Sequence, residues 1–150
     1  MNIAVVDDEE IIRQQIHGFI KKQKPESEIS DFSTGEGLLA AGREFDIIFL
    51  DIQMEGMGGI EAARILRQRN VDAVLVFITG IREYVFEALD LSAFHYLLKP
   101  IEESKFIEVL GRAVDEAGRR KVQKEQQIFI RTKNRGYTLN LSSILYIENR

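Results

Sequence analysis

Apolar residues cluster along the chain in short blocks that are separated by stretches of mixed character. Four blocks are almost continuously apolar, at positions 3–6, 45–50, 73–78 and 94–98. Such runs are typical of parallel strands that are covered on both faces of a sheet. The block at 28–32 is more polar and suits a strand at a sheet edge. The pattern therefore predicts five strands.

Between these blocks, apolar residues recur three and four positions apart, which is helical spacing. A strict alternation of strands and helices favours an α/β fold with a doubly wound, parallel, five-stranded sheet. Right-handed crossovers favour the strand order 2-1-3-4-5, which puts the polar strand 28–32 at an edge. The residues that define the helices are Ile12, Ile16, Phe19 and Ile20; Leu38 and Leu39; Ile60, Ala63 and Leu66; Val85, Ala88 and Leu89; Phe106, Leu110, Ala113 and Ala117.

The character of the chain changes after the fifth predicted helix. Residues 1–126 carry a net charge of −7, whereas residues 127–150 carry +3. Apolar positions thin out before this point, so the last helix is expected to run on as a solvated linker. We therefore expect a compact domain over 1–120, a helical linker over 121–127 and a separate segment over 128–150.

The segment from residue 128 has the period of strands rather than helices. Apolar and polar residues alternate over 128–133 and again over 137–141, on either side of a turn-forming stretch at 134–136. This pattern predicts a β-hairpin, followed by a third apolar stretch at 144–147. Such a short C-terminal β segment leaves strand edges unpaired. We expect it to be disordered or to pair with a second chain as a homodimer.

Composition excludes several function classes. The chain has 150 residues, 45% of them apolar, which suffices for one domain core with a short appendage. It has no cysteine, which excludes thiol catalysis and thiolate zinc sites and suits a reducing, cytoplasmic location. No apolar run approaches the roughly 18 residues of a membrane span, and no signal peptide is recognisable. The net charge of −4 argues against nucleic-acid binding by the whole chain.

Chemically suggestive residues follow four of the predicted strands. Asp7 and Asp8 come after the first, Asp51 after the third, Thr79 after the fourth and Lys99 after the fifth. The carboxyl ends of parallel strands meet at one edge, where such sheets place their sites. Three carboxylates there would repel one another unless a hard cation such as Mg²⁺ bound them. With a hydroxyl and an ammonium group for phosphate oxygens, the site suits transfer of a phosphoryl group to a carboxylate.

Each of these residues also has an ordinary structural explanation. The acidic pair Asp7 and Asp8 could be solvated loop residues, and Asp51 could form a turn or cap a helix. Thr79 precedes a glycine, as many turn residues do, and Pro100 only ends a strand. Their joint occurrence at the same ends of four strands favours a functional site.

At this point the chain resembles a response-regulator receiver domain of two-component signalling, over about residues 1–124. The family has the flavodoxin-like (CheY-like) fold, in agreement with the predicted sheet. The matching stretches are Val6-Asp7-Asp8-Glu9, Leu50-Asp51-Ile52-Gln53-Met54, Met57-Gly58-Gly59-Ile60-Glu61, Phe77-Ile78-Thr79-Gly80 and Tyr96-Leu97-Leu98-Lys99-Pro100.

The resemblance implies a role for each matching residue. Asp51 would accept a phosphoryl group from a sensor histidine kinase. Asp7, Asp8 and Asp51 would hold Mg²⁺, together with the backbone carbonyl of Gln53. The chain would act as a phosphoacceptor signalling domain and not as an enzyme beyond weak self-phosphorylation and self-dephosphorylation.

The resemblance also implies a conformational switch. Thr79 would bind the phosphoryl group and Lys99 would pair with the charge on Asp51. Tyr96 would turn inward as Thr79 moves, and the Lys99–Pro100 peptide bond would be cis. The chain departs from the family pattern at Glu55, where proline is common, at Gly58, and at residues 94–95, where acidic residues are common. These departures bear on the phosphoryl lifetime and the output face.

Residues 128–150 resemble the opening of a LytTR-type DNA-binding domain, of which they would form about a quarter. A protein with the complete domain would be a transcription regulator, and its DNA binding would need that complete output domain. Arg131, Lys133 and Arg135 could then contact phosphates, whereas in this segment alone they suit a solvated hairpin face.

Three other functions could use a similar arrangement of strands and carboxylates. An aspartate-based phosphatase would need an acid two residues after Asp51, but Gln53 stands there. A flavin-binding module would need a phosphate-binding loop where the acidic residues 7–10 stand. A receiver-like interaction module that works without phosphorylation stays the alternative. His17 and His95 match no motif and are interpreted as structural.

Overall fold

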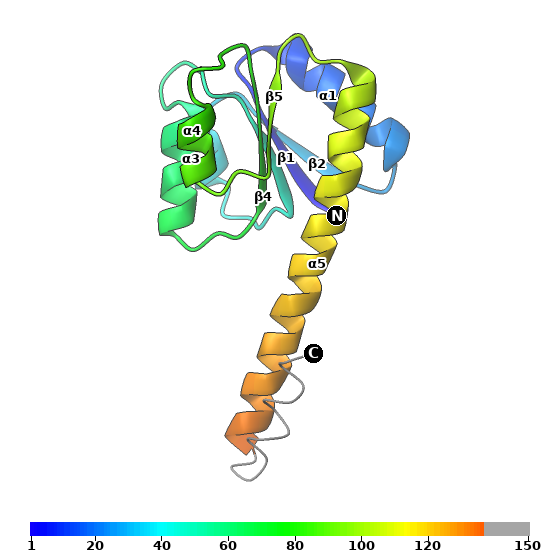
Figure 1. Cartoon of the computed structure of the whole chain (residues 1–150), viewed down its shortest axis with the longest axis vertical. Helices are drawn as coiled ribbons and strands as arrows, with labels where there is room; N and C mark the ends of the chain where they lie inside the picture. Colours follow the sequence, from blue (N-terminus) through cyan, green and yellow to red (C-terminus); the bar gives the residue numbers. More distant parts are fainter. Residues whose placement is uncertain (137–150) are drawn as a thin grey trace. The chain divides into compact units, whose positions relative to one another are not determined.

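The computed structural model describes residues 1–136 and forms a five-stranded parallel sheet flanked by helices (Figure 1). The strand order β2-β1-β3-β4-β5 confirms the prediction. The chain divides into two units, one over Met1–Ala117 and one that begins at Gly118. The elements are β1 (Asn2–Val6), α1 (Glu10–Gln23), β2 (Glu28–Phe32), α2 (Gly35–Ala40), β3 (Ile47–Leu50), α3 (Gly59–Gln68), β4 (Val74–Thr79), α4 (Val85–Asp90), β5 (His95–Leu98) and α5 (Glu103–Gly136).

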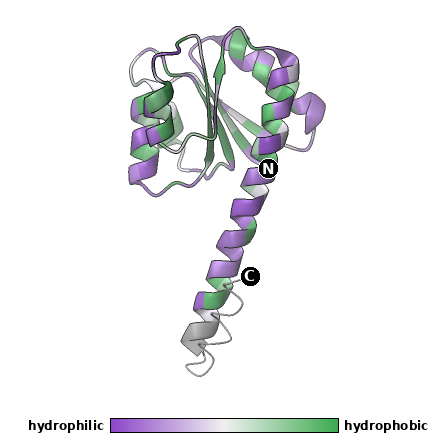
Figure 2. Cartoon of the chain, viewed as in Figure 1, coloured by the Kyte–Doolittle hydropathy of each residue, from purple (hydrophilic) through white to green (hydrophobic). Residues whose placement is uncertain are grey.

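Two apolar layers lie between the sheet and its helices. The strands are largely coloured as hydrophobic in Figure 2, as this coverage requires. Alternate residues of β1 face opposite layers, with Ile3 in one and Ala4 in the other. Helices α1 and α5 cover the first layer, where the Phe106 ring lies 5.1 Å from that of Phe49. Helices α2, α3 and α4 cover the second. This double coverage explains why β3 and β4 are apolar at nearly every position.

The polar strand β2 lies at a sheet edge, as its composition predicts. Glu28 and Asp31 are exposed, whereas every residue of β3 is buried. The register between β1 and β3 then places Asp7 beside Asp51. Val6 pairs with Leu50, so the residues that follow them leave neighbouring strands side by side.

The C-terminal β segment is the part of the prediction that the structure contradicts. Helix α5 is continuous from Glu103 to Gly136, so residues 128–136 are helical and not the first strand and turn of a hairpin. The stretch 118–136 contains no proline and is rich in strong helix formers, which lets the helix continue. Ile128 is 53% exposed and Phe129 is 52% exposed, so their alternation does not mark one buried face.

The helix also includes residues 121–127, the expected helical linker. The Thr132 hydroxyl donates to the carbonyl of Ile128 at 2.9 Å, a bond from one helical turn to the one before it. The second predicted strand, 137–141, and the apolar stretch 144–147 lie outside the described residues.

Replacing Gly59 with alanine should destabilise the domain by about 1–3 kcal/mol. A Cβ there would lie 2.0 Å from the carbonyl oxygen of Asp51, and a backbone atom cannot give way as a flexible side chain can. Gly59 also donates its N–H to Ile52 at 2.9 Å, which closes the loop after β3. The free energy of unfolding in urea measures the loss.

Gly111→Ala is the matched control, because a Cβ at this position in α5 would meet nothing within 4 Å. It should stabilise the chain by about 0.5–1 kcal/mol, the usual difference between glycine and alanine inside a helix. Equal effects of the two substitutions would contradict the close approach of α3 to Asp51.

Candidate functional site

The site is built from four strand ends. The strand ladder continues beyond β1 and β3, since Asp51 donates its N–H to the Val6 carbonyl at 2.9 Å. On the other side, Lys99 donates its N–H to the carbonyl of Thr79 at 2.9 Å. Backbone pairing therefore holds Asp51, Thr79 and Lys99 together at the carboxyl end of the sheet, as expected from the sequence.

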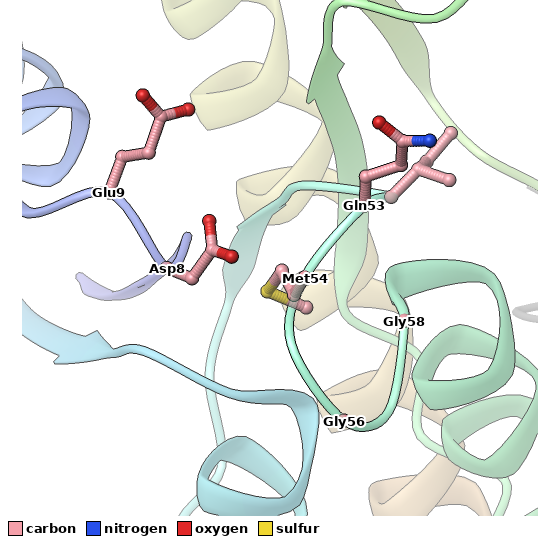
Figure 3. Close-up of a pocket in the computed structure, with 7 residues that line it drawn as sticks. Asp8, Glu9, Gln53, Met54, Gly56 and Gly58 are labelled. Atoms are coloured by element: carbon pink, nitrogen blue, oxygen red, sulfur yellow. The ribbon is translucent and has the colours of Figure 1, made fainter.

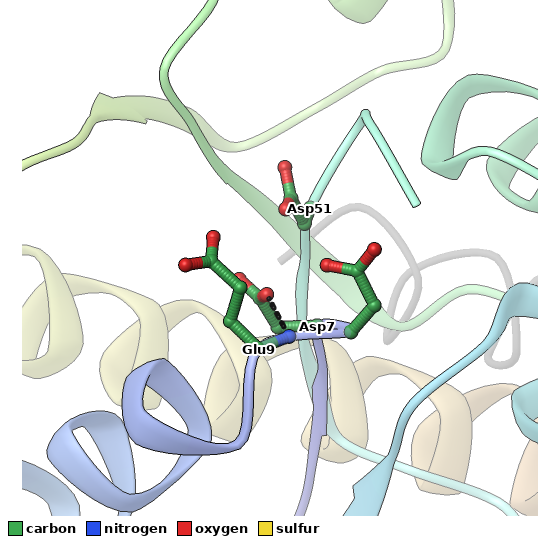
Figure 4. Close-up of side chains that lie close together, drawn as sticks. Asp7, Glu9 and Asp51 are labelled. Atoms are coloured by element: carbon green, nitrogen blue, oxygen red, sulfur yellow. Dashed lines mark hydrogen bonds between the residues drawn. The ribbon is translucent and has the colours of Figure 1, made fainter. Parts of the chain in front are cut away.

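Four carboxylates gather at this edge (Figure 4). One oxygen from each of Asp7, Asp8, Glu9 and Asp51 lies within 4.8 Å of the others. Asp7 and Asp51 are buried, whereas Asp8 and Glu9 are exposed. Such oxygens, of which some stay open to water, are the ligands that Mg²⁺ prefers. The donor set therefore fits a hard divalent cation.

The ammonium group of Lys99 lies among three of these carboxylates. Its Nζ is 2.9 Å from Asp7 Oδ2, 3.0 Å from Asp51 Oδ2 and 3.2 Å from Glu9 Oε1. Burial disfavours the charged form of Lys99, but the hydrogen bonds with Asp7 and Asp51 outweigh burial and raise the pKa of the ammonium group. The lysine therefore stays charged across the physiological range and partly neutralises the cluster.

Burial raises the pKa of the Asp7 carboxyl above its ordinary value. The charge of Lys99 and the Glu9 N–H, which donates to Asp7 Oδ1 at 2.9 Å, act in the opposite direction but do not cancel burial. The nearby charge of Asp51 raises it further. A second cation beside this pair would relieve the repulsion between the two buried carboxylates.

Thr79 contributes a buried hydroxyl to the same edge of the sheet. Its Oγ1 has no hydrogen-bond partner in the part of the chain that the structure describes. A buried, unsatisfied polar atom is costly and rare, and it calls for an explanation such as a missing ligand. The Thr79 hydroxyl is thus available to a bound group at this edge.

Tyr96 lies on β5, the strand next to that of Thr79, and is half-buried against the apolar layer of α3 and α4. Its ring centroid is 6.2 Å from that of Phe77, and its hydroxyl donates to the carbonyl of Ile81. Burial raises the pKa of Tyr96 above its usual value. The Lys99–Pro100 peptide bond that follows the strand is cis.

The loop after Asp51 borders an open hollow beside the acidic cluster (Figure 3). The backbone N–H of Gln53 donates to Asp51 Oδ1 at 3.3 Å, so the loop turns back toward the carboxylate. The hollow is lined by Asp8, Glu9, Ile52, Gln53, Met54, Gly56 and Gly58.

Sequence reasoning assigned no role to Glu9, although its ion pair with Lys99 makes it part of the cluster. The only signal was its place directly after the acidic pair Asp7 and Asp8. His17 lies elsewhere, 3.4 Å from Asp31. The Nδ1 atom of His95 accepts the backbone N–H of Tyr96 at 2.9 Å, which agrees with a structural role.

Comparison with known proteins settles the family. Residues 3–111 match the family model described as the response regulator receiver domain. The chain belongs to the response-regulator receiver family. Membership makes it a phosphoacceptor signalling module rather than a conventional enzyme.

Similar proteins include longer regulators. The transcriptional regulatory protein BtsR of Escherichia coli K12 is 30% identical over 159 residues, covering 100% of this chain and 66% of its own length. The sensory transduction protein LytT of Bacillus cereus is 29% identical over 136 residues, covering 89% and 52%. The chain thus spans about half to two thirds of these relatives.

Solved structures with this fold include two receivers. The response regulatory domain of MrkE from Klebsiella pneumoniae has 31% identity and a TM-score of 0.74, covering 79% of this chain and 99% of that one. The response regulator TrrA from Thermotoga maritima, solved in complex with Mg²⁺–BeF, has 28% identity and a TM-score of 0.65, covering 75% and 97%. No helix among the described residues has the length and apolarity to cross a membrane.

Thr79→Val should stabilise the ligand-free protein by about 1 kcal/mol, because it replaces a buried hydroxyl that lacks a partner with a methyl group of similar size. Thermal or urea unfolding measures the change. Thr79→Ser is the control, since it keeps the hydroxyl but loses a buried methyl group and should destabilise. A clear loss of stability in Thr79→Val would mean that the hydroxyl is satisfied without a ligand.

Proposed function

We propose that this chain is the receiver part of a two-component response regulator and that Asp51 accepts a phosphoryl group from a sensor histidine kinase. The observation that carries the proposal is the placement of Asp51. Its carboxylate is buried at a strand end, 3.0 Å from Lys99 Nζ, and it belongs with Asp7, Asp8 and Glu9 to a cluster whose oxygens could hold a metal ion. This is the environment that an anionic nucleophile needs in order to meet an anionic phosphoryl group.

In this proposal an oxygen of Asp51 forms a bond to phosphorus while the bond from phosphorus to the donor imidazole breaks. The imidazole leaves with the bonding electron pair and takes up a proton from solvent. Lys99 and the free hydroxyl of Thr79 then bind phosphoryl oxygens, which accounts for the unsatisfied Thr79 Oγ1. Burial of Asp51 limits the access of water to the new acyl phosphate.

Magnesium is the cofactor of this proposal. Asp7, Asp8 and Asp51 would hold it, with the backbone carbonyl of Gln53, and the cluster of carboxylate oxygens supports that assignment. When bound, the ion supplies positive charge that offsets repulsion between the carboxylates and the incoming phosphoryl group.

Tyr96 would carry the signal away from Asp51. Movement of Thr79 toward a phosphoryl group changes the space beside Tyr96, whose hydroxyl is bonded to the Ile81 carbonyl between β4 and α4. Breaking that bond would free the loop that starts α4. The switch would thus act on the surface formed by α4, β5 and α5.

The output would be control of transcription through an attached LytTR-type domain. Similarity over the whole chain to BtsR, which is named as a transcriptional regulatory protein, supports this proposal, as does the resemblance of residues 128–150 to such a domain. The proposed division is a receiver over 1–120 and a helical linker from 121, which α5 extends to Gly136 rather than to residue 127, with the output fragment after it. DNA would bind only through the complete output domain, and the protein would work in the cytoplasm, as a monomer or a homodimer.

Beryllofluoride, which mimics an aspartyl phosphate, should bind saturably when Mg²⁺ is present. Amide NMR spectra should show shifts around Asp51, Thr79 and Lys99 because the mimic bonds to the first and contacts the other two. Shifts should extend to Tyr96 and α4 if the switch works as proposed.

Asp51→Asn is the control that removes the acceptor oxygen with little change of shape, and it should abolish the response. A wild-type chain that does not respond would leave the phosphorylation-independent interaction module as the better reading. A response that persists in Asp51→Asn would place the acceptor elsewhere.

A further inference from the structure

Residues 53–58 form most of the loop between β3 and α3 (Figure 3). Two of its backbone N–H groups bind carboxylates of the acidic cluster. Gln53 donates to Asp51 Oδ1 at 3.3 Å, and Glu55 donates to Asp8 Oδ2 at 3.3 Å. Under the proposed function the same carboxylates also bind the metal ion, and Asp51 bonds to the phosphoryl group. The hydrogen bonds from Gln53 and Glu55 then compete with these ligands for the carboxylate oxygens.

A third carboxylate holds the same loop and is not part of that cluster. Glu36 Oε1, on α2, accepts the backbone N–H of Met57 at 3.1 Å. Its other oxygen lies against Gly56, where an added Cβ would be only 2.8 Å from Glu36 Oε2. Gly56 has a φ of 76°, so the loop turns at the point where the carboxylate touches it. The contact of Glu36 is therefore with the tip of the loop.

The first turn of α2 is itself well placed to act as an anchor. The Thr34 side chain caps the helix by accepting the Gly37 N–H at 3.0 Å. Gly35 is buried against the loop, since a Cβ there would lie 3.0 Å from the Met57 carbonyl oxygen. Helix α2 also follows β2, which pairs with β1. Glu36 thus ties the loop to β2 and, through the pairing of β2 with β1, to the strand that leads into Asp7 and Asp8.

We propose that Glu36 is a positioning residue for the metal site. It holds the 53–58 loop so that the Gln53 carbonyl stays beside Asp51 when the cluster carboxylates turn to Mg²⁺. The proposal rests on the proposed function, because it assumes that the cluster binds Mg²⁺. It also explains how the loop keeps its shape with Glu55 at the place where receivers commonly have proline.

The test is an amide NMR titration of the whole chain with MgCl₂ alone, comparing wild type with three variants. Glu36→Ala removes the acceptor, Glu36→Gln keeps an acceptor oxygen but loses the charge, and Glu61→Ala removes an exposed carboxylate from α3. Glu36→Ala should weaken Mg²⁺ binding by about five-fold, the factor expected for one hydrogen bond. Its Gly56 and Met57 amide signals should shift before any Mg²⁺ is added.

Glu36→Gln and Glu61→Ala should bind Mg²⁺ as wild type does, within about two-fold, because a surface charge alone contributes little. Wild-type affinity in Glu36→Ala would overturn the proposal. Equal weakening in Glu36→Gln and Glu36→Ala would also overturn it, since charge and not the hydrogen bond would then explain the effect. Absence of Mg²⁺ binding in wild type would instead overturn the proposed function, and this inference with it.

A second variant tests the same contact from the side of the loop. Gly56→Ala places a methyl group against the Glu36 carboxylate, strains the backbone at a φ of 76°, and should weaken Mg²⁺ binding as well. Combined with Glu36→Ala it should add less than its separate effect, because both changes break the same contact. Fully additive effects would contradict a shared contact.

Discussion

The ion pairs of one lysine hold the functional edge of this receiver together. Lys99 Nζ lies within 3.2 Å of three carboxylates, two of which are buried. Buried carboxylates are stable only when they are paired, and removal of one partner leaves an uncompensated charge. The lysine therefore makes it possible for Asp7 and Asp51 to lie side by side out of water.

The strand order of the sheet brings Lys99 and its carboxylate partners together. Strands β1 and β3 are neighbours, and β4 lies between β3 and β5. Because all of these strands are parallel, their carboxyl ends lie at the same end of the sheet. Apolar residues bury these strands on both faces, so their ends are held firmly and the charged side chains begin directly beyond them, with Asp7 and Asp51 buried and Asp8 and Glu9 exposed. Function sits where the apolar runs stop, and this explains why a chain of ordinary composition can hold a strongly charged site.

The sheet and most of the site residues can be predicted from the sequence for a physical reason. Short, continuous apolar runs predict buried parallel strands, and parallel strands bring their carboxyl ends together. Asp7, Asp51, Thr79 and Lys99 could therefore be grouped before any coordinates were known. The polar character of β2 predicted its edge position in the same way.

Other contacts depend on loop paths and side-chain conformations, which the spacing of residues in the sequence does not determine. The contact of Glu36 with Met57 joins residues 21 positions apart through a loop whose path is set by Gly56. The ion pair of Glu9 depends on the side-chain conformation of Lys99. Residues 128–136 show the opposite failure, because an alternating pattern predicted strands where strong helix formers and exposure allow a helix to continue.

The most direct test of the central claim is to find the residue that carries the phosphoryl group. The chain would be incubated with Mg²⁺ and a small acyl phosphate, the product reduced with borohydride to trap any aspartyl phosphate, and its peptides read by mass spectrometry. The account predicts one modified residue, Asp51, and none in Asp51→Asn. Failure of the wild-type chain to gain a phosphoryl group, or modification of Asp7 or Asp8 instead, would contradict it.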